Sequence, residues 1–347
     1  MTGAPAGRGM AEAGETGRED AALKRRQRTA LLALAAMLAL LLLAMMDTVR
    51  RLAALWMIED GYYSYGFLIL PVSLLLIWRR RRALADLVPQ QEPLAIPALL
   101  LTDGFWLASR AAEIATFEYL ALPLSACLLV FALQGRRIVR RLAFPLVFLA
   151  FMLPFGGPLL PALQTITTHF ADTLLWLAGI PTYREGTLIE TSFGLFNIAE
   201  ACAGLQFLAA NLVAGVLFAH LAFSSPVAQA LVIAVSVIAP ILINGLRAFG
   251  IIAVIHLSGD AGIAGPDHIV YGWVLFMAAI VVTFVVGAKF ADWPKRGQAP
   301  ATPAPTPETD GPAGPWRLAF LAPLALSVLA APALQLWFPA ALRVVAE

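Results

Sequence analysis

The sequence of 347 residues is poor in charge and in cysteine. Asp, Glu, Lys and Arg make up only 13% of it, against roughly 25% in an ordinary soluble domain. This shortage excludes a disordered chain and a coiled coil, both of which need charge. Two cysteines, Cys127 and Cys202, are too few for a disulfide framework. The formal net charge of +2 gives no basis for nucleic-acid binding.

Hydrophobic residues are abundant instead, at 60% of the chain, and the mean hydropathy is +0.79. A soluble core of this length cannot bury that much apolar surface, so a water-soluble enzyme is excluded. Long apolar runs follow one another, and each can form a helix in lipid, where the backbone must bond to itself. They cover residues 30–46, 62–78, 94–109, 114–133, 142–154, 205–223, 227–243, 269–286 and 318–338. The sequence predicts an all-α polytopic membrane helix bundle, with about eight core spans and one further C-terminal span.

The segments that flank this predicted membrane domain, residues 29–296, differ from it in composition. Residues 1–28 are rich in Gly, Ala and charge, which predicts a disordered cytoplasmic tail. Residues 297–315 are rich in Pro, Ala and Thr, which predicts an extended linker. Residues 316–347 hold the ninth run, interpreted as an appendage to the core with a short outer tail. No convincing cleavage site follows the first apolar run, so no cleavable signal peptide is predicted.

The basic residues predict the orientation, because cytoplasmic loops carry an excess of Lys and Arg. Four basic clusters, at residues 24–28, 79–82, 136–141 and 289–296, fall on one side if the N-terminus is cytoplasmic. Residues 159–178 complicate this count, since they are apolar but carry several polar side chains. That polarity favours a helix in the interface or packed across the bundle. A full span there would move Cys202 to the cytoplasmic side.

Unusual polar residues concentrate in three motifs, and ionisable residues at membrane depth are functional candidates. The motifs are Glu200-Ala201-Cys202-Ala203-Gly204, Asn244-Gly245-Leu246-Arg247 and Asp267-His268. The predicted topology puts Cys202 at the start of one span, Arg247 at the end of the next and His268 at the start of the third. These three helix ends would meet on the outer face.

Cys202 has two open interpretations. A predicted helix N-terminus favours a thiolate, whereas Glu200, two residues earlier, opposes it. Gly204 would leave room for a substrate backbone. Position alone leaves a nucleophile and a small buried structural residue equally open. Cys127, inside an apolar run, fits the structural interpretation.

Arg247 breaks the positive-inside pattern, and Asn244 precedes it by three residues on nearly the same helix face. A guanidinium there could hold a carboxylate or stabilise an oxyanion. The alternative is an interfacial arginine that reaches lipid phosphate.

His268 follows Asp267, which is a plausible helix N-cap that would fix its position. Its imidazole would suit a general acid and base. His256 and His169 are alternatives, whereas His220 is predicted near the other face. The histidines are scattered without a close pair, so neither a metal nor another cofactor is predicted.

Residues 185–198, just before Cys202, show partial alternation of apolar and polar residues with glycine punctuation. This pattern favours a short hairpin, and the alternative is an irregular loop.

The three motifs, together with Asp60-Gly61-Tyr62-Tyr63-Ser64-Tyr65-Gly66, make the sequence resemble the exosortases over about residues 56–293. The resemblance implies a cysteine-type peptidase or transpeptidase of the bacterial inner membrane, with Cys202, Arg247 and His268 as the catalytic set. It implies a site that faces the periplasm and acts on C-terminal sorting signals of the PEP-CTERM kind beside membrane lipid. Some relatives continue into an outer domain from exopolysaccharide loci, so a periplasmic partner of that origin is a candidate. Tyr65 stands where many members have histidine, so no functional role is carried over from the family to this position.

Two rival classes fit the generic features of the chain. One is a polytopic transporter, and the other is a non-catalytic assembly factor for exopolysaccharide export. Transporters often contain internal repeats and polar sites at mid-depth. The sequence shows no repeat, and its polar motifs fall at one face, which favours the enzyme.

Overall fold

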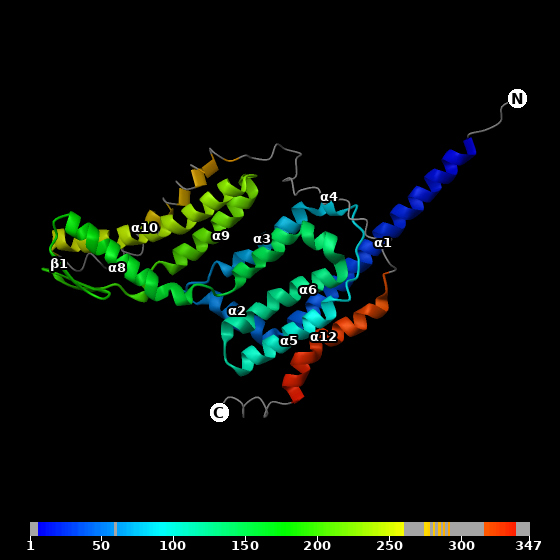
Figure 1. Ribbon diagram of the computed structural model, residues 1–347, viewed down its shortest axis with the longest axis horizontal. Helices are drawn as coiled ribbons and strands as arrows, with labels where there is room; N and C mark the ends of the chain where they lie inside the picture. The colour runs from blue at the N-terminus through cyan, green and yellow to red at the C-terminus, as the bar shows by residue number, and fades with distance from the viewer. Residues whose placement is uncertain are drawn as a thin grey trace. The chain divides into compact units, whose positions relative to one another are not determined.

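The computed structural model describes residues 6–58, 61–259, 274–277, 280–281, 284–285, 287–288, 291 and 316–337. The chain divides into two compact units. The first unit comprises residues 1–58, 64–153 and 306–347, and the second comprises residues 59–63 and 154–305. Both units are predominantly helical (Figure 1).

The helices of the first unit pack around a core of leucine and alanine. They are α1 (Ala6–Ala44), α2 (Met46–Met57), α3 (Gly66–Arg79), α4 (Arg81–Leu84), α5 (Ala95–Ala111), α6 (Ala115–Arg141), α7 (Ala143–Phe148), α12 (Leu321–Trp337) and the 3₁₀ helices η1 (Leu149–Met152) and η5 (Leu318–Phe320). Leu41 of α1, Leu99 of α5 and Leu129 of α6 are fully buried in one cluster. In lipid, van der Waals packing of these side chains holds the helices together, because lipid tails are as apolar as leucine.

The first helix corrects the prediction of a disordered tail at residues 1–28, because α1 begins at Ala6. Between Met10 and Arg28 the chain is rich in Ala, Glu, Lys and Arg, which are strong helix formers. Gln27 in this segment donates hydrogen bonds of 2.6 and 3.0 Å to the carbonyls of Ala85 and Leu87. The helical run therefore continues directly into the first apolar segment.

The C-terminal helix α12 belongs to the core of the first unit, which corrects its interpretation as an appendage. It packs against α5 and α1. Leu324, Val328 and Ala331 are buried, and their spacing places them on one face of the helix. The carboxylate of Asp103 in α5 accepts a hydrogen bond of 3.4 Å from the Ala331 N–H.

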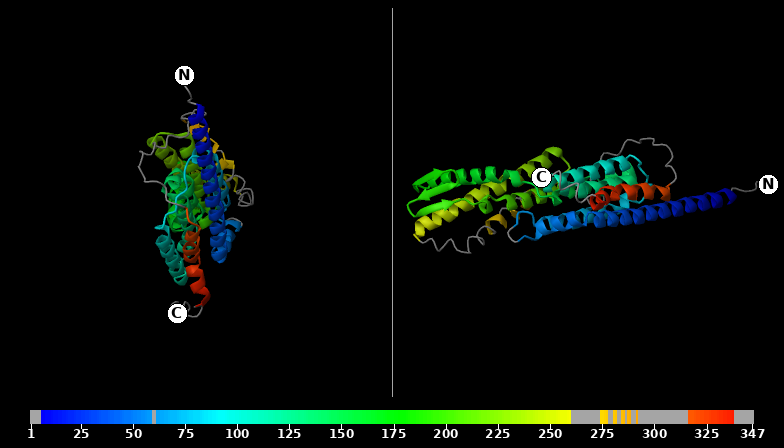
Figure 2. Two further views of the ribbon diagram at one scale, coloured as in Figure 1. Left: turned by 90° about the vertical axis from the view of Figure 1, so that its right-hand side faces the viewer. Right: turned by 90° about the horizontal axis from the view of Figure 1, so that it is seen from below.

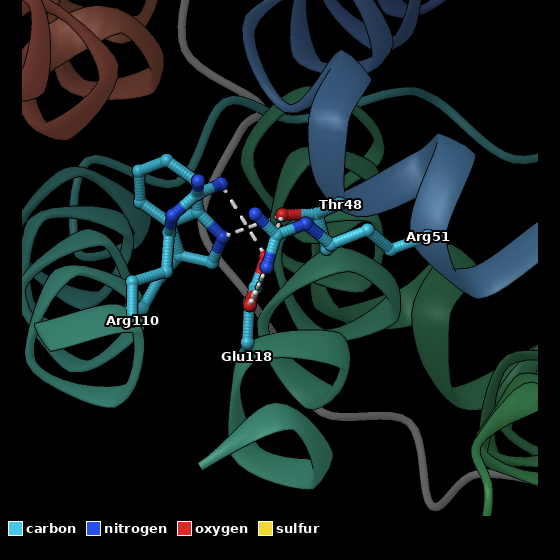
Figure 3. Close-up of polar contacts among 5 residues, drawn as sticks. Thr48, Arg51, Arg110 and Glu118 are labelled. Atoms are coloured by element: carbon cyan, nitrogen blue, oxygen red, sulfur yellow. Dashed lines mark hydrogen bonds and ion pairs between the residues drawn. The ribbon is translucent and has the colours of Figure 1, made fainter. Parts of the chain in front are cut away.

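A buried carboxylate joins three helices of the first unit (Figure 3). Glu118 of α6 is 3% exposed and accepts a hydrogen bond of 2.7 Å from Thr48 of α2. It pairs with Arg110 of α5 at 3.3 Å and with the exposed Arg51 at 3.9 Å. Trp106 donates to the Thr48 hydroxyl at 3.0 Å. Hydrogen bonds and cations from both neighbouring helices thus offset the desolvation of Glu118.

Among its described residues, the second unit has three helices of 18 residues or more and a small sheet. Its elements are η2 (Gly157–Leu159), α8 (Leu160–Leu177), β1 (Thr182–Glu185), β2 (Leu188–Thr191), β3 (Gly194–Asn197), η3 (Glu200–Cys202), α9 (Leu205–Ala222) and α10 (Pro226–Ser258). Helix α10 packs against both α8 and α9. The sheet lies at one end of α8 and α10 (Figures 1 and 2).

The sheet extends the predicted hairpin to three antiparallel strands in the order β1-β2-β3. Its register pairs Ile189 of β2 with Arg184 of β1 and with Phe196 of β3. Ile189 is fully buried, together with Ala171 and Leu175 of α8. The period-two pattern found in the sequence therefore turns one face of β2 toward the helices.

Four helical segments of the described chain are long and apolar enough to cross a membrane, by length and composition. They are residues 21–44, 115–141, 200–222 and 226–258. A fifth is counted if residues 143–152 and 157–177 act as one broken span. Fewer spans than predicted meet this criterion, partly because α3 has only 14 residues and α12 only 17. The predicted span at 269–286 and the linker at 297–315 fall largely outside the described residues.

Candidate functional site

Cys202 ends the short 3₁₀ helix η3, between the sheet and α9. Its N–H donates a hydrogen bond of 2.8 Å to the Ala199 carbonyl. Gly204 then adopts a left-handed conformation, with φ 77°, and turns the chain into α9. Cys202 is half-buried. The thiol thus lies three residues before the N-terminus of α9, as the sequence predicts, where the helix dipole favours negative charge.

Asn244 connects Cys202 to two helices. It lies in α10 and is 3% exposed. Its Nδ2 donates hydrogen bonds of 2.7 Å to the Cys202 carbonyl and 3.0 Å to the Thr167 hydroxyl of α8. Its Oδ1 is buried and has no partner among the described residues. One amide therefore fixes the backbone at Cys202 against both α8 and α10.

Gly204 has a different role from the one predicted. A Cβ atom at this position would lie 2.6 Å from Cγ of Asn244. The space beside Gly204 is therefore filled by Asn244 and does not receive a substrate backbone. Glycine is required both by this contact and by the positive φ.

Arg247 lies inside a helix, which corrects its predicted place at a helix end. Helix α10 continues for eleven residues beyond it, to Ser258. Residues 251–255 extend the apolar pattern, and the glycine of the Asn244-Gly245 pair does not end the helix. Gly245 instead allows close contact with Phe170 of α8, since a Cβ there would lie 2.2 Å from the ring.

A cavity of about 290 Å³ brings the first two motifs together. Cys202, Asn244 and Arg247 all line it. The other lining residues come from β3, the residue that follows it and the C-terminal half of α10, namely Leu195, Phe196, Asn197, Ile198, Ala248, Ile251 and Ile252. The Nε of Arg247 is buried and has no hydrogen-bond partner in the described part of the chain. The cavity therefore combines a thiol with an unpaired guanidinium donor within apolar walls.

The other predicted site residues, Glu200, Asp267 and His268, are not among the residues that line the cavity in the described part of the chain. Glu200 is exposed at the start of η3. Asp267 and His268 lie outside the described residues, so their place relative to the cavity stays a prediction. Of the alternative histidines, His256 packs edge-to-face on Phe193, with ring centroids 4.9 Å apart, and His169 is exposed.

Residues 56–285 match the family of the transmembrane exosortases (Exosortase_EpsH). This match covers about two thirds of the chain and includes both motifs of the cavity. The chain belongs to the transmembrane exosortase family. No curated protein and no solved structure matches it. The match confirms the resemblance and the prediction of a polytopic helical membrane protein.

Two contacts of this exosortase site were not predicted. Thr167 bonds Asn244, and Gln164, one turn earlier in α8, donates to the Ile198 carbonyl at the end of β3. Both belong to the polar set that marked residues 159–178 as unusual. The hydrogen bonds of these two side chains hold α8 against Asn244 and against the residue that follows β3.

Tyr62 is a further neighbour of the exosortase cysteine. It precedes α3 in the sequence and packs against the cluster that contains Ala203 and Leu205. Burial raises the pKa of the Tyr62 hydroxyl above its ordinary value, and the electrostatic interactions of Tyr62 with Glu200 and Cys202 raise it further. The segment at residues 60–66 thus packs through Tyr62 beside the residues that follow Cys202. This segment contributed to the family resemblance in the sequence, but no role was predicted for Tyr62.

No group of three or more His, Cys, Asp or Glu side chains that could hold a metal ion occurs within the described ranges. Cys127, the second thiol of this exosortase, is half-buried in α6 and contacts the Leu146 carbonyl at 3.7 Å. Its surroundings are apolar, as expected of a packing residue.

Proposed function

We propose that this exosortase is a membrane-embedded cysteine peptidase and transpeptidase that cleaves C-terminal sorting signals of the PEP-CTERM kind from exported proteins. The observation that carries this proposal is the shared cavity of Cys202 and Arg247. These residues are 45 positions apart, and both lie in motifs that resemble the proposed catalytic set of the family. A thiol beside an oxyanion donor is the minimal equipment for acyl transfer.

In the first step, the Cys202 thiolate attacks the carbonyl carbon of the scissile peptide bond. The carbonyl oxygen becomes an oxyanion, and the Arg247 guanidinium donates hydrogen bonds to it. The C–N bond then breaks, and the leaving amine takes a proton from His268. The acyl group remains on Sγ as a thioester, and the C-terminal fragment leaves.

In the second step, a nucleophile from water, lipid or a glycan attacks the thioester carbonyl. It gives its proton to His268, the C–S bond breaks, and the thiolate is restored. Asn244 and Gly204 hold the cysteine backbone throughout, and Asp267 positions His268 as a helix N-cap. Glu200, two residues before Cys202 and exposed at the start of η3, is the remaining supporting residue.

The sheet supports a location of the site at the membrane boundary. An open sheet edge exposed to lipid does not occur at hydrocarbon depth, because its backbone groups would lack partners. The 33 residues of α10 extend about 50 Å, whereas the hydrocarbon core is about 30 Å thick. The C-terminal turns of α10, which carry Arg247 and contact the sheet cluster, fit outside the core. The basic loops favour the periplasmic side of the inner membrane.

The activity is tested with an exported reporter that ends in Pro-Glu-Pro, about 20 apolar residues and a basic tail. Wild-type protein and Cys127→Ala should process this reporter, whereas Cys202→Ala should not. Both variants remove one half-buried thiol, so they are matched. Processing by Cys202→Ala would exclude a cysteine-peptidase function and would favour a transporter or an assembly factor.

Sidedness is tested with a membrane-impermeant thiol reagent on intact inner membranes. Cys202 should react from the periplasm, whereas a cysteine introduced by Arg80→Cys should react only from the cytoplasm. Reaction of Cys202 only after permeabilisation would reverse the proposed orientation.

A further inference from the structure

The cavity has a sheet edge as one of its walls. Among the described residues, β3 pairs with β2 alone. The Ile198 N–H bonds the Thr187 carbonyl at 3.0 Å, and Phe196 is paired with Ile189. Because backbone direction alternates along an antiparallel strand, the N–H and C=O groups of Leu195 and Asn197 point away from β2. Both residues also line the cavity.

The two edges of the sheet differ in their protection against pairing. Natural edge strands discourage added strands with charged residues or proline. The outer strand β1 carries two charges, Arg184 and Glu185. The strand β3, Gly194-Leu195-Phe196-Asn197, contains neither a charge nor a proline. The unprotected edge is therefore the one beside Cys202.

Two buried polar atoms at the cavity match the groups of a peptide backbone. The Nε of Arg247 is a donor and the Oδ1 of Asn244 is an acceptor, and neither has a partner in the described ranges. An extended peptide offers a C=O to the first and an N–H to the second. The cavity volume, at the lower end of the roughly 300–1,000 Å³ of ligand pockets, suits a short segment.

We infer that the substrate segment around the scissile bond binds as an extended strand, which adds to the β3 edge. The backbone groups of Leu195 and Asn197 pair with it and present its carbonyl to Cys202 and Arg247. This inference rests on the proposed function and adds the recognition mode. Main-chain pairing supplies affinity, and alternate side chains of the segment enter the cavity.

A disulfide scan tests this geometry. The reporter described above carries single cysteines at consecutive positions around its Pro-Glu-Pro segment. It is combined with Asn197→Cys in a Cys202→Ala, Cys127→Ala background, which lacks other thiols and leaves the reporter uncut. Crosslinks should form at alternate reporter positions, because side chains alternate along a strand. Tyr183→Cys on the exposed, opposite edge is the control and should form none.

Processing rates provide a second readout. Asn197→Pro removes an N–H that the sheet does not use, whereas Asn197→Ala keeps it, and both lose the side-chain contact with Thr187. Asn197→Pro should process the reporter about tenfold more slowly than Asn197→Ala, because one backbone hydrogen bond to the substrate is lost.

The outcomes separate the two proposals. If otherwise wild-type protein leaves the reporter uncut, the proposed function fails. In a different outcome, wild-type protein cuts the reporter while crosslinks occur at every position, at helical spacing or not at all. Any of these three patterns would contradict strand addition and leave the proposed peptidase function intact. Equal processing by Asn197→Pro and Asn197→Ala would also overturn strand addition. If Asn197→Pro does not fold, the crosslink pattern decides.

Discussion

The side-chain amide of Asn244 holds the backbone carbonyl of Cys202 at 2.7 Å, across 42 positions of sequence. Arg247 follows Asn244 by three residues in the same helix. The cysteine and the arginine therefore have their positions set by one turn of α10. A shift of that turn would move the guanidinium and the cysteine backbone together.

Asn244→Ala should reduce processing more than its effect on stability explains. It removes the bonds to Cys202 and Thr167, and one unsatisfied buried group costs about 1–3 kcal/mol. Asn211→Ala is a matched control, since this buried amide of α9 also bonds a backbone carbonyl, that of Ser236 at 2.9 Å. Thermal unfolding in detergent and the processing rate are compared. Equal loss of processing at equal destabilisation would contradict a positioning role.

Gly204→Ala should disrupt the site because its Cβ would meet Asn244 at 2.6 Å. Gly186→Ala provides the comparison, because Gly186 also has positive φ, at 59°, but has open space around it. Strain at positive φ alone costs about 1 kcal/mol and affects both variants. Alkylation of Cys202 and reporter processing should change only in Gly204→Ala. Normal processing by this variant would show that Asn244 can move without consequence.

Arg247→Lys should lower the processing rate by about 10²–10³, the usual effect of losing an oxyanion donor. Lysine keeps the charge but lacks the planar, forked donor set. Arg184→Lys, on the outer strand beside Asp172, should process normally. Single-turnover rates with a saturating reporter measure both. A near wild-type rate for Arg247→Lys would reduce Arg247 to an interfacial anchor.

The sequence predicted the site best where chemistry and spacing coincide. Cys202 and Arg247 were named from their motifs, and the structure places both at one cavity. The hairpin before Cys202 was indicated by alternation at residues 185–198. Strand β1 was missed because Thr182–Glu185 overlaps that pattern only at Glu185. Family membership followed from the same motifs.

The errors arose where local signals compete with packing. The predicted helix end near Arg247 was wrong because α10 continues to Ser258, and Gly245 makes a close contact with Phe170 inside that helix. The room predicted beside Gly204 is filled by Asn244, a long-range contact that spacing does not reveal. Residues 1–28 contain both glycine and strong helix formers, and the helix prevails from Ala6 onward.

Glu118→Ala should destabilise the first unit by about 3–5 kcal/mol, because Arg110 would lose its buried partner. Arg51→Ala should change stability by only about 0.5 kcal/mol, since the Arg51 side chain is 59% exposed and lies 3.9 Å from the carboxylate. Thermal unfolding of both variants in the same detergent measures the difference. Similar midpoints would show that Glu118 does not stabilise the packing of α2, α5 and α6.

The central claim, a thioester on Cys202, is tested by intact-mass analysis of His268→Ala after incubation with the reporter. Loss of general acid and base help slows turnover by roughly 10²–10⁴. We expect the acyl intermediate to accumulate because the incoming nucleophile has no base to take its proton, so that attack on the thioester becomes the slowest step. The account predicts a covalent adduct on Cys202 that neutral hydroxylamine releases and that Cys202→Ala lacks. Reporter cleavage that continues with no adduct, or full cleavage by Cys202→Ala, would contradict it.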